Sequence, residues 1–548
     1  MNFFIGKIKK VSLYGWMLVI VILIGIFLRT YNLHSWLEFR DDQSRVAILV
    51  SQVLNGERSW PIVGPYMSYS GNGDHEEDNS FHIGPIYYYF QIISAKIFGD
   101  YPDKLAYPDV FFSVISILLL YVFLKIYFKQ NMALGITGLY AISAYFIHYS
   151  RFAWNSNLIP CFVLLFLLSL FKLMDKNEKP AWLWTALVGI AMGVGIQLHA
   201  ILIPIFLLVA FCVFLFSMKK DYKIWKRWAA IFLIIAFLNV PQIYSELKTN
   251  FSNTKIFFDF SSHNNNGVNE SKLGWLGLLK NDLDCNIEAN SYFLSSYGSM
   301  HCSYDIFSPA TYTEIRWKSS SKMFQDLIAI VTMLIGIIFS LLGYYLLIKN
   351  AKEEPEKNKK YFLYLVALYA AISFIIMIPL STGKLSDLRY YTPTCFVAYI
   401  FLGFLFKFLE EKIVKKHLYL IFAIFIMLVF TNVQAITDVA STLMAGNKSC
   451  DSHSAAATLG EMESVAQYIS NSYNQRVVYF GGEGLVRIEK GPLMYVLKKH
   501  KIDFVNANQN ISHNGPTYMI SCKAGAGKHY SFKEIGNIYV FDLNSPAE

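Results

Sequence analysis

The apolar residues of this chain are gathered in long blocks, and this feature limits its fold more than any other. Each block is roughly 17 to 25 residues long, the length that a helix needs to cross a bilayer core of about 30 Å. Hydrophobic residues make up 54% of the chain and charged residues 16%, against roughly 25% charged residues in a soluble domain. We therefore predict an α-helical polytopic membrane protein with eleven spans, near 14–28, 105–127, 131–147, 158–173, 182–198, 200–217, 228–243, 324–348, 361–380, 389–407 and 417–434.

The first block follows Lys7, Lys9 and Lys10 and so resembles a signal sequence. No small-residue cleavage site comes after Leu28, where the chain continues Arg-Thr-Tyr-Asn. We therefore expect this block to be retained as the first span.

The stretch 182–217 is nearly uncharged and must contain a turn. As one helix with a rise of 1.5 Å per residue it would be about 54 Å long, too long for a single crossing. Gln197-Leu-His199 is the only polar place for the turn. The sequence therefore predicts a helical hairpin with His199 at a membrane face.

Segment 85–98 decides the topology of everything after it. Its fourteen residues are short for a span, and its tyrosines suit an interface. If it lies flat, the cytoplasmic loops together carry 22 Lys and Arg; these loops are 1–11, 125–130, 172–181, 218–227, 349–360 and 407–416. If it crosses, every later loop changes sides and the positive-inside rule is violated. We therefore expect a cytoplasmic N-terminus, an extracytoplasmic C-terminus and an interfacial 85–98.

The expected topology divides the chain into two domains. Residues 1–434 form a transmembrane domain with outside loops at 29–104 and 244–323, and residues 435–548 form a small extracytoplasmic α/β domain. Apolar periodicity predicts the helices and strands of this second domain. The helices are expected at 455–472 and 487–501, and the strands at 476–480, 517–521 and 537–543. The net charge of +9 then reflects the Lys and Arg residues of the cytoplasmic loops and does not indicate nucleic-acid binding.

Four of the seven cysteines lie in the expected outside regions. They form two pairs within the same compartment, Cys285 with Cys302 and Cys450 with Cys522. In an oxidising compartment each pair is expected to form a disulfide, the alternative being four unpaired thiols. The other three cysteines fall within spans and read as small apolar residues: Cys161, Cys212 and Cys395.

Polar residues near the outer membrane face are few, and they suit a reaction with a lipid-borne anion. A carboxylate such as Asp41 or Asp42 can act as a general base toward a hydroxyl. Arginine can hold a phosphate and offset the charge of a phosphate leaving group. The alternative is that these side chains are interfacial anchors. The candidate site residues are Asp41, Asp42, Arg45, His82, Tyr87, Arg151, Asn155, Asn157, His199, Arg389 and Tyr390.

Five motifs occur in an order that resembles a known superfamily. They are Asp42-Gln-Ser-Arg45, Ile62-Val-Gly-Pro65, His82-Ile-Gly-Pro-Ile-Tyr-Tyr-Tyr89, Ser150-Arg-Phe-Ala-Trp-Asn-Ser-Asn157 and Gln197-Leu-His199. Over residues 12–245 the chain resembles bacterial membrane glycosyltransferases with the C-type fold. This superfamily includes protein O-mannosyltransferases and the lipid A aminoarabinose transferase. Leu388-Arg-Tyr-Tyr391 adds weaker support.

The resemblance implies an enzyme that transfers a sugar from a polyprenyl-phosphate donor, with inversion, outside the bacterial inner membrane. The acceptor would be a hydroxyl on a protein, a glycolipid or an envelope polysaccharide. Asp42 matches the catalytic aspartate, with Asp41 as the alternate if the register slips by one residue. Arg45 would orient the carboxylate or touch phosphate, and Arg389 and Tyr390 resemble the region near the donor phosphate.

The remaining site residues depart from the family's pattern. Ile83 stands where relatives have a lysine, ahead of Tyr87, so either a phosphate contact is lost or His82 substitutes for the lysine. Asn155 and Asn157 stand where several relatives have a second acid, which puts in doubt a two-carboxylate site and any divalent cation held by it. No other cofactor is indicated. Arg151 and His199 would help to hold the phosphate.

Two other classes of function stay open at this point. A transporter or flippase of lipid-linked glycans would show ionisable residues deep within its spans, whereas most spans here are free of charge and Asp109 lies near a span end. A noncatalytic scaffold would use the C-terminal domain for recognition and would not need Asp42, Arg151 and His199 on one face.

Overall fold

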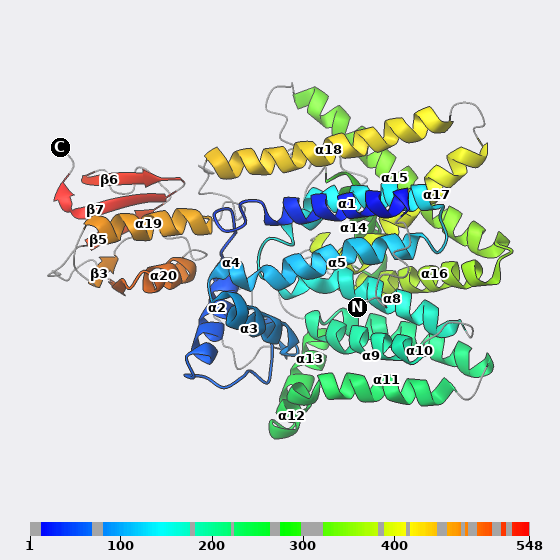
Figure 1. Cartoon of the computed structure of the whole chain (residues 1–548), viewed down its shortest axis with the longest axis horizontal. Helices are drawn as coiled ribbons and strands as arrows, with labels where there is room; N and C mark the ends of the chain where they lie inside the picture. Colours follow the sequence, from blue (N-terminus) through cyan, green and yellow to red (C-terminus); the bar gives the residue numbers. More distant parts are fainter. Residues whose placement is uncertain are drawn as a thin grey trace, which may run out of the picture.

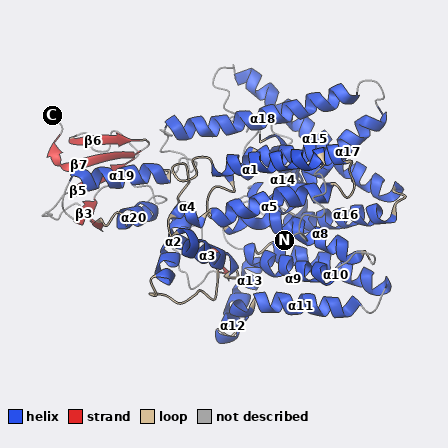
Figure 2. Cartoon of the chain, in the orientation of Figure 1, coloured by secondary structure: helices blue, strands red, loops and turns tan. Residues whose placement is uncertain are grey.

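The computed structural model shows a bundle of long helices with a small α/β domain at one end (Figure 1). Among the described residues, strands occur in that domain and in one short two-stranded pair (Figure 2). The structure describes residues 12–67, 81–175, 181–220, 224–263, 274–296, 322–381, 388–412, 417–445, 457–472, 477–480, 490–506, 517–521, 529–536 and 538–546.

The bundle contains most of the helices, and short 3₁₀ segments join several of them. Its helices are α1 (Leu13–Thr30), α5 (Tyr107–Leu124), α6 (Gln130–Ile142), α7 (Ala144–His148), α8 (Ile159–Met174), α9 (Ala181–Leu198), α10 (Leu202–Lys220), α11 (Trp225–Leu238), α12 (Val240–Lys248), α13 (Ser252–His263), α14 (Trp275–Ser295), α15 (Lys322–Glu353), α16 (Lys357–Met377), α17 (Cys395–Lys412) and α18 (His417–Ala445). The 3₁₀ segments are η2 (Asn155–Leu158), η5 (Ile378–Leu380) and η6 (Leu388–Thr394).

The helices confirm a polytopic membrane protein. Within the described ranges, 9 helices are long and apolar enough to cross a membrane, or up to 10 if α11 and α12, which meet at 65°, form one broken span. The span expected at 131–147 is instead two helices, α6 and α7, separated at Ser143. The 13 residues of α6 are short for a crossing.

The break at Ser143 has a partner far away in the sequence. A backbone N–H freed inside an apolar bundle must find an acceptor. The N–H of Ala144 donates to Oδ1 of the buried Asn432 on α18, at 3.1 Å. The side-chain amide of Asn432 in turn donates to the carbonyls of Leu294 and Leu428. The interruption is therefore a satisfied feature of the bundle.

The predicted hairpin is present. Helix α9 ends at Leu198 and α10 begins at Leu202, so His199 lies in a turn between two candidate spans. Segment 85–98 is α3 (Ile86–Phe98), whose 13 residues are not among the candidate spans. It lies at the end of the bundle nearest the α/β domain, beside α2 (Figure 1).

The sidedness of the membrane stays a prediction, and two reporter fusions test it. A fusion after Lys360 should report the cytoplasm and one after Ser386 should report the outside, because the Lys-rich loop 349–360 is retained inside. Enzymatic reporters or cysteine accessibility give the readout. The opposite pair of results would mean that 85–98 crosses the membrane and that the whole orientation is inverted.

Burial separates the interior helices from those at the periphery. In the candidate spans that contain α8 and α17, 83% of the most apolar 18-residue stretch is buried inside the protein, whereas in α1 and α18 only 11% of it is. Large apolar side chains of α1, such as Trp16, Leu23 and Phe27, are exposed. In a bilayer these surfaces face lipid, so α1 and α18 form the outer wall of the bundle.

A smaller layer of elements lies between the bundle and the α/β domain (Figure 1). Its helix α2 packs against α3 on one side and against α20 of the α/β domain on another. Strands β1 and β2 pair antiparallel, with Tyr66 opposite His82. The elements are α2 (Asp41–Leu54), β1 (Tyr66–Met67), β2 (Phe81–His82), α3 and α4 (Pro102–Leu105).

The C-terminal domain has a five-stranded sheet in the order β4-β3-β5-β7-β6. Strand β3 is parallel to β4 and β5, and β7 is antiparallel to β5 and β6. Both predicted helices and all three predicted strands are present, whereas β4 and β6 were not predicted. The elements are α19 (Leu459–Ser472), β3 (Val477–Phe480), α20 (Lys490–Lys499), β4 (Asp503–Asn506), β5 (Thr517–Ser521), β6 (Tyr530–Ile535) and β7 (Ile538–Pro546).

The C-terminal domain shares a hydrophobic core with the α2 layer. Phe39, Ala47 and Val50 belong to the same buried cluster as Met462 and Val496. The backbone N–H of Leu459 also donates to the carbonyl of Leu37, at 2.9 Å. Helix α18 continues to Ala445, past the expected end of the last span at 434. The division of the chain at 434/435 therefore falls within a helix and stays a proposal.

Of the cysteines, Cys161, Cys212 and Cys395 are free and Cys285 is disulfide-bonded. The remaining three predicted disulfide residues, Cys302, Cys450 and Cys522, lie outside the described residues. Both pairings stay predictions, and we expect each bond to stabilise its segment by about 2–4 kcal/mol. Peptide mapping without reduction should recover Cys285–Cys302 and Cys450–Cys522. Alkylation of all four thiols without reductant would contradict this.

Candidate active site

A cavity of about 750 Å³ opens between α2, segment 58–66, β2, the start of α3, the loop before η2, and η6. Side chains from widely separated parts of the chain therefore share one space. Eight of the eleven substrate-site residues predicted from the sequence line it. They are Asp42, Arg45, His82, Tyr87, Asn155, His199, Arg389 and Tyr390.

Asp42 projects from the first turn of α2 into this cavity. The helix begins after Arg40, whose backbone N–H donates to Gln43 Oε1 at 3.1 Å and so satisfies one free donor of the helix end. A carboxylate in the first turn is stabilised by the helix dipole. Leu49 and Gln52 follow Asp42 along the same face of α2 and also line the cavity. The Asp42 side chain is 66% exposed, so a substrate can reach it.

Arg45 fixes the direction of the Asp42 carboxylate. Its guanidinium donates one hydrogen bond to Asp42 Oδ1 and another to the hydroxyl of Tyr66, and it lies 5.0 Å from the centre of the Tyr66 ring. Burial by itself lowers the pKa of Arg45, but the charge of Asp42 and the contact with Tyr66 raise it above its ordinary value. Arg45 therefore stays charged and holds the carboxylate in one orientation.

Asp41 does not line the cavity. It lies toward α20 of the C-terminal domain, where a Cβ added to Gly491 would lie 3.0 Å from Asp41 Oδ1. The Asp41 carbonyl accepts a hydrogen bond from Ser44 Oγ at 2.9 Å. The geometry thus distinguishes two adjacent carboxylates that the sequence left as alternatives, and it favours Asp42.

His82 lies beside Tyr66, the partner of Arg45, with 5.9 Å between the two ring centres, and is held by a tight backbone arrangement. Its Nδ1 is 3.0 Å from the carbonyl of Gly64, and its backbone N–H donates to Asn253 Oδ1 at 2.6 Å. A Cβ at Gly64 would lie 2.1 Å from the carbonyl oxygen of Gly84, so this approach requires glycine. The motif Ile62-Val-Gly-Pro65 therefore shapes the cavity wall. Asn253, on α13, was not predicted to take part.

Arg389 and Tyr390 of η6 also line the cavity. The Arg389 guanidinium lies 5.7 Å from the Trp154 ring and 5.2 Å from the Tyr390 ring. Tyr390 also meets the ring of His199 edge-on, at 5.9 Å between ring centres. Aromatic faces attract a cation and restrict its position. Trp154 lines the cavity and was missed as a site residue, although it lies within one of the five motifs.

His199 is uncharged in this site. Burial, and to a smaller extent the charge of Arg389, lower the pKa of its imidazole from 6.5 to about 4. A neutral imidazole can donate one hydrogen bond and accept another, and it adds no positive charge at neutral pH. The predicted role of His199 as a partner for phosphate therefore becomes that of a neutral hydrogen-bonding group.

The His199 side chain gives a test in the acid range. A native pKa near 4 means that the unfolded chain takes up a proton before the folded one, so stability should fall as pH drops from 6.5 to 4. We expect the melting temperature of His199→Gln to fall less over this range than that of the wild type. The pH profiles of activity of the wild type and His199→Gln should have the same form near pH 6.5. An inflection near pH 6.5 that is present in the wild type and absent from His199→Gln would contradict a neutral His199.

Arg151 and Asn157 do not line the cavity. Arg151 donates to the carbonyls of Leu28 and Tyr31, at 3.0 and 2.8 Å, and so satisfies the free acceptors at the end of α1. Asn157 donates to Asp109 Oδ1 at 3.0 Å and to the carbonyl of Phe152. Both side chains serve the framework of the site, in place of the substrate contacts expected from the sequence.

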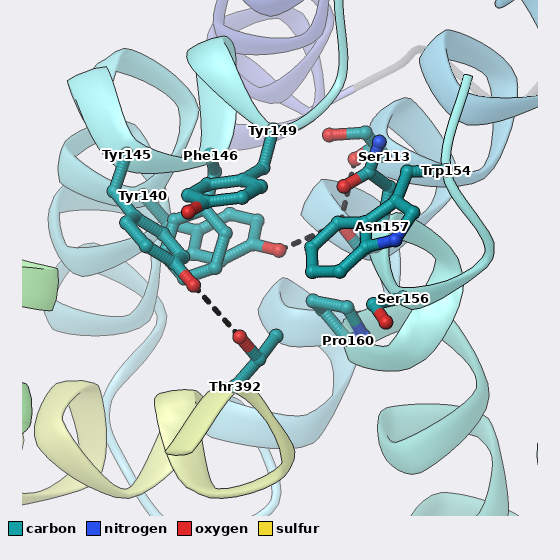
Figure 3. Close-up of a pocket in the computed structure, with 11 residues that line it drawn as sticks. Ser113, Tyr140, Tyr145, Phe146, Tyr149, Trp154, Ser156, Asn157, Pro160 and Thr392 are labelled. Carbon is teal, nitrogen blue, oxygen red and sulfur yellow. Dashed lines mark hydrogen bonds between the residues drawn. The ribbon is translucent and has the colours of Figure 1, made fainter. Parts of the chain in front are cut away.

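Asn155 faces the cavity and also closes the hairpin turn, because its amide donates to the carbonyl of Leu198. Behind Trp154 lies a second, much smaller cavity of about 10 Å³, which is enough space for about one water molecule (Figure 3). Thr392 of η6 is hydrogen-bonded there to the Tyr145 hydroxyl at 2.7 Å. This second cavity belongs to the packing that supports η6, and it is too small for a substrate.

No group of three His, Cys, Asp or Glu side chains lies close enough to hold a metal ion, within the part of the chain that the structure describes. The chemistry of the large cavity comes from one exposed carboxylate, three arginines, two histidines and many aromatic rings. The lining residues that were not predicted include Gln52, Arg58 and Trp60, which lie outside any charged cluster near a span end.

Comparison with known proteins supports the resemblance found in the motifs. Residues 82–244 match the family model described as Dolichyl-phosphate-mannose-protein mannosyltransferase. This stretch includes the His82, Trp154 and His199 walls of the cavity, but it includes neither Asp42 nor Arg389. No curated protein sequence matches the chain.

The solved structures that are similar to this protein include the following three, each at 13% sequence identity. ArnT from Cupriavidus metallidurans, bound to undecaprenyl phosphate, has a TM-score of 0.42 and the match covers 97% of this chain and 98% of that one. The apo oligosaccharyltransferase of Archaeoglobus fulgidus has a TM-score of 0.48, covering 92% of this chain and 65% of that one. The S. cerevisiae Pmt1-Pmt2 complex bound to the sugar donor has 0.33, covering 45% and 35%. Likeness at this level carries no argument about activity.

Proposed function

We propose that this protein transfers a sugar from a polyprenyl-phosphate donor to an acceptor hydroxyl, with Asp42 as the general base. The observation that carries the proposal is that the Asp42–Arg45 pair and the Arg389–Trp154 pair line the same cavity of about 750 Å³. A base and a phosphate-binding cation on separate walls are the two groups that such a transfer needs. The family match over residues 82–244 supports the same class of reaction.

The acceptor side of the reaction belongs to α2. Asp42 takes the proton from the acceptor hydroxyl as that oxygen attacks the anomeric carbon of the sugar. Arg45 and Tyr66 hold the carboxylate so that it faces the hydroxyl. Alignment and general-base help together can supply several orders of magnitude in rate.

The donor side belongs to η6 and the loop before η2. The phosphate gains negative charge as the sugar leaves, and the Arg389 guanidinium offsets it. Trp154 and Tyr390 hold that guanidinium in place. Neutral His199 and Asn155 offer hydrogen bonds to sugar or phosphate oxygens. Attack from the α2 side and departure toward η6 invert the configuration at the anomeric carbon.

In this proposal the cavity opens on the extracytoplasmic face of the cell membrane, with residues 435–548 on the same side. The prenyl chain of the donor lies in the surrounding lipid. The acceptor hydroxyl is carried by a protein, a glycolipid or a polysaccharide.

The test uses purified protein with synthetic polyprenyl-phosphate sugars and a panel of the three acceptor types. We expect acceptor-dependent release of polyprenyl phosphate and a product with inverted anomeric configuration, measured by NMR. A product with retained configuration would contradict the proposed geometry. Movement of an intact lipid-linked sugar across a vesicle membrane, without its consumption, would indicate a transporter instead.

A further inference from the structure

Asp109 is a completely buried carboxylate with no place in the mechanism above. It lies in the first turn of α5 and is 0% exposed, and it does not line the cavity. Burying a carboxylate is costly unless donors surround it. A group of this kind, beside a functional site, is expected to have a definite role.

Three donors from two other segments converge on Asp109. The Tyr87 hydroxyl lies 3.0 Å from Oδ2, the backbone N–H of Trp154 lies 3.1 Å from Oδ1, and the Asn157 amide lies 3.0 Å from Oδ1. Tyr87 is at the start of α3, Trp154 immediately precedes η2, and Asn157 lies within η2. A buried donor that loses its acceptor carries the full cost of desolvation, so these hydrogen bonds hold the segments together. Asp109 therefore ties α3 to the loop that precedes η2.

Two of these hydrogen bonds join Asp109 to residues that line the active-site cavity. Tyr87 and Trp154 line it, whereas Asp109 and Asn157 lie behind them. The Arg389 guanidinium lies 5.7 Å from the centre of the Trp154 ring. The contacts thus run from Asp109 through the Trp154 backbone to the cation that we assign to the donor phosphate.

We propose that Asp109 is the positioning residue of the donor side, which sets Trp154, and through it Arg389, relative to α3. The inference rests on the proposed function for its ligand, the polyprenyl phosphate, but its structural part is independent of any ligand. It also gives Tyr87 and Asn157 a role that differs from the substrate contacts expected from the sequence. Both are donors that keep a buried carboxylate in place.

The competing idea is that Asp109 replaces the second acid of the site and reacts with substrate. Two variants and a control separate the two ideas. Asp109→Asn keeps the size of the side chain but replaces one of its two acceptor oxygens with an amide nitrogen, and Tyr87→Phe removes one of its donors. Asp103→Asn is the matched control, because Asp103 is 2% exposed and contacts His34 and Lys104, which do not line the cavity.

The first measurement is hydrogen exchange of the purified protein without ligand. We expect Asp109→Asn to speed exchange roughly tenfold or more in peptides covering 151–157 and 388–394, since one of the acceptor oxygens that join these segments is lost. Asp103→Asn should leave both peptides unchanged. The proposal would be overturned if the exchange rate at 388–394 were unchanged in Asp109→Asn. It would also be overturned if exchange rose equally along the whole chain in Asp109→Asn and Asp103→Asn.

The second measurement is binding of polyprenyl phosphate alone, together with donor kinetics. Asp109→Asn should raise the dissociation constant and the donor KM roughly tenfold, while kcat changes by less than about threefold. Tyr87→Phe should act in the same direction, and the two changes together should cost less than their sum because they share one contact. A fall in kcat as large as that of Asp42→Asn, with KM unchanged, would make Asp109 a reacting group. If the wild type binds no polyprenyl phosphate, the proposed function fails, and hydrogen exchange still decides the role of Asp109.

Discussion

Replacing Asp42 with asparagine should lower the turnover number for sugar transfer by roughly 10² to 10⁴-fold, the range that a positioned general base contributes. The amide keeps the size of the side chain but cannot take the acceptor proton. Because Asp42 lies on α2 and the donor-phosphate cation lies on η6, binding of polyprenyl phosphate should stay within about twofold of the wild type. Steady-state transfer assays and equilibrium binding on the purified variant give both values.

Asp41→Asn is the matched control for this experiment, because it makes the same change one residue earlier. Asp41 lies toward Gly491 and outside the cavity. We expect its variant to retain transfer within a few-fold of the wild type, a loss typical of a site that does not react. An inactive Asp41→Asn beside a fully active Asp42→Asn would move the base by one residue. Full activity in both variants and in the double variant would exclude a carboxylate base.

The second large effect is expected at Arg389. Arg389→Ala should raise the donor KM roughly tenfold or more, because a charge-assisted contact to phosphate is lost. It should also lower the turnover number by roughly 10² to 10³-fold, since the same cation offsets the charge that develops on the leaving phosphate. Lysine in its place should recover only part of both values, because it lacks the planar group that lies against Trp154.

Arg151→Ala provides the contrast, since both arginines were expected at the phosphate. Arg151 is engaged with the carbonyls of Leu28 and Tyr31. Its removal should destabilise the protein by about 0.5–1.5 kcal/mol, as two hydrogen bonds at the end of α1 are lost, and should leave the donor KM within about twofold. Thermal unfolding and donor kinetics on both variants decide the matter. A donor KM raised more by Arg151→Ala than by Arg389→Ala would reverse the assignment.

The features of the fold that could be predicted from the sequence are those that depend on local composition. The length of each apolar block gave the candidate spans, and a nearly uncharged stretch too long for one crossing gave the hairpin at His199. The 13 residues of α3 were correctly expected not to form a span of their own. In each case the decisive quantity, hydrophobic length, is contained within the segment itself.

The break between α6 and α7 could not be predicted in this way. The acceptor for the freed N–H of Ala144 is Asn432, which is 288 residues away along the chain. From the local sequence, 131–147 reads as one continuous apolar block. The break becomes favourable only when α18 packs beside it, so no local pattern contains the information.

The candidate site shows the same division. Motif order placed Asp42, His82, His199 and Arg389 in one site, and the cavity brings them together. Which of two neighbouring carboxylates faces the cavity depends on the rotation of α2 about its axis, because adjacent helical residues point about 100° apart. That rotation is set by packing against α20, which comes more than 400 residues later in the sequence. The roles of Trp154 and Asp109 likewise depend on contacts between distant segments.

The measurement that tests the central claim most directly is mass spectrometry of the envelope of host cells that carry the wild-type gene, the Asp42→Asn variant or no copy. We expect one sugar-sized mass increment on a protein, glycolipid or polysaccharide in wild-type cells only. The polyprenyl-phosphate sugar should accumulate equally in the other two strains. Restoration of the same modification by Asp42→Asn at the wild-type level would contradict the account, because Asp42 would then not be the base of a sugar transfer.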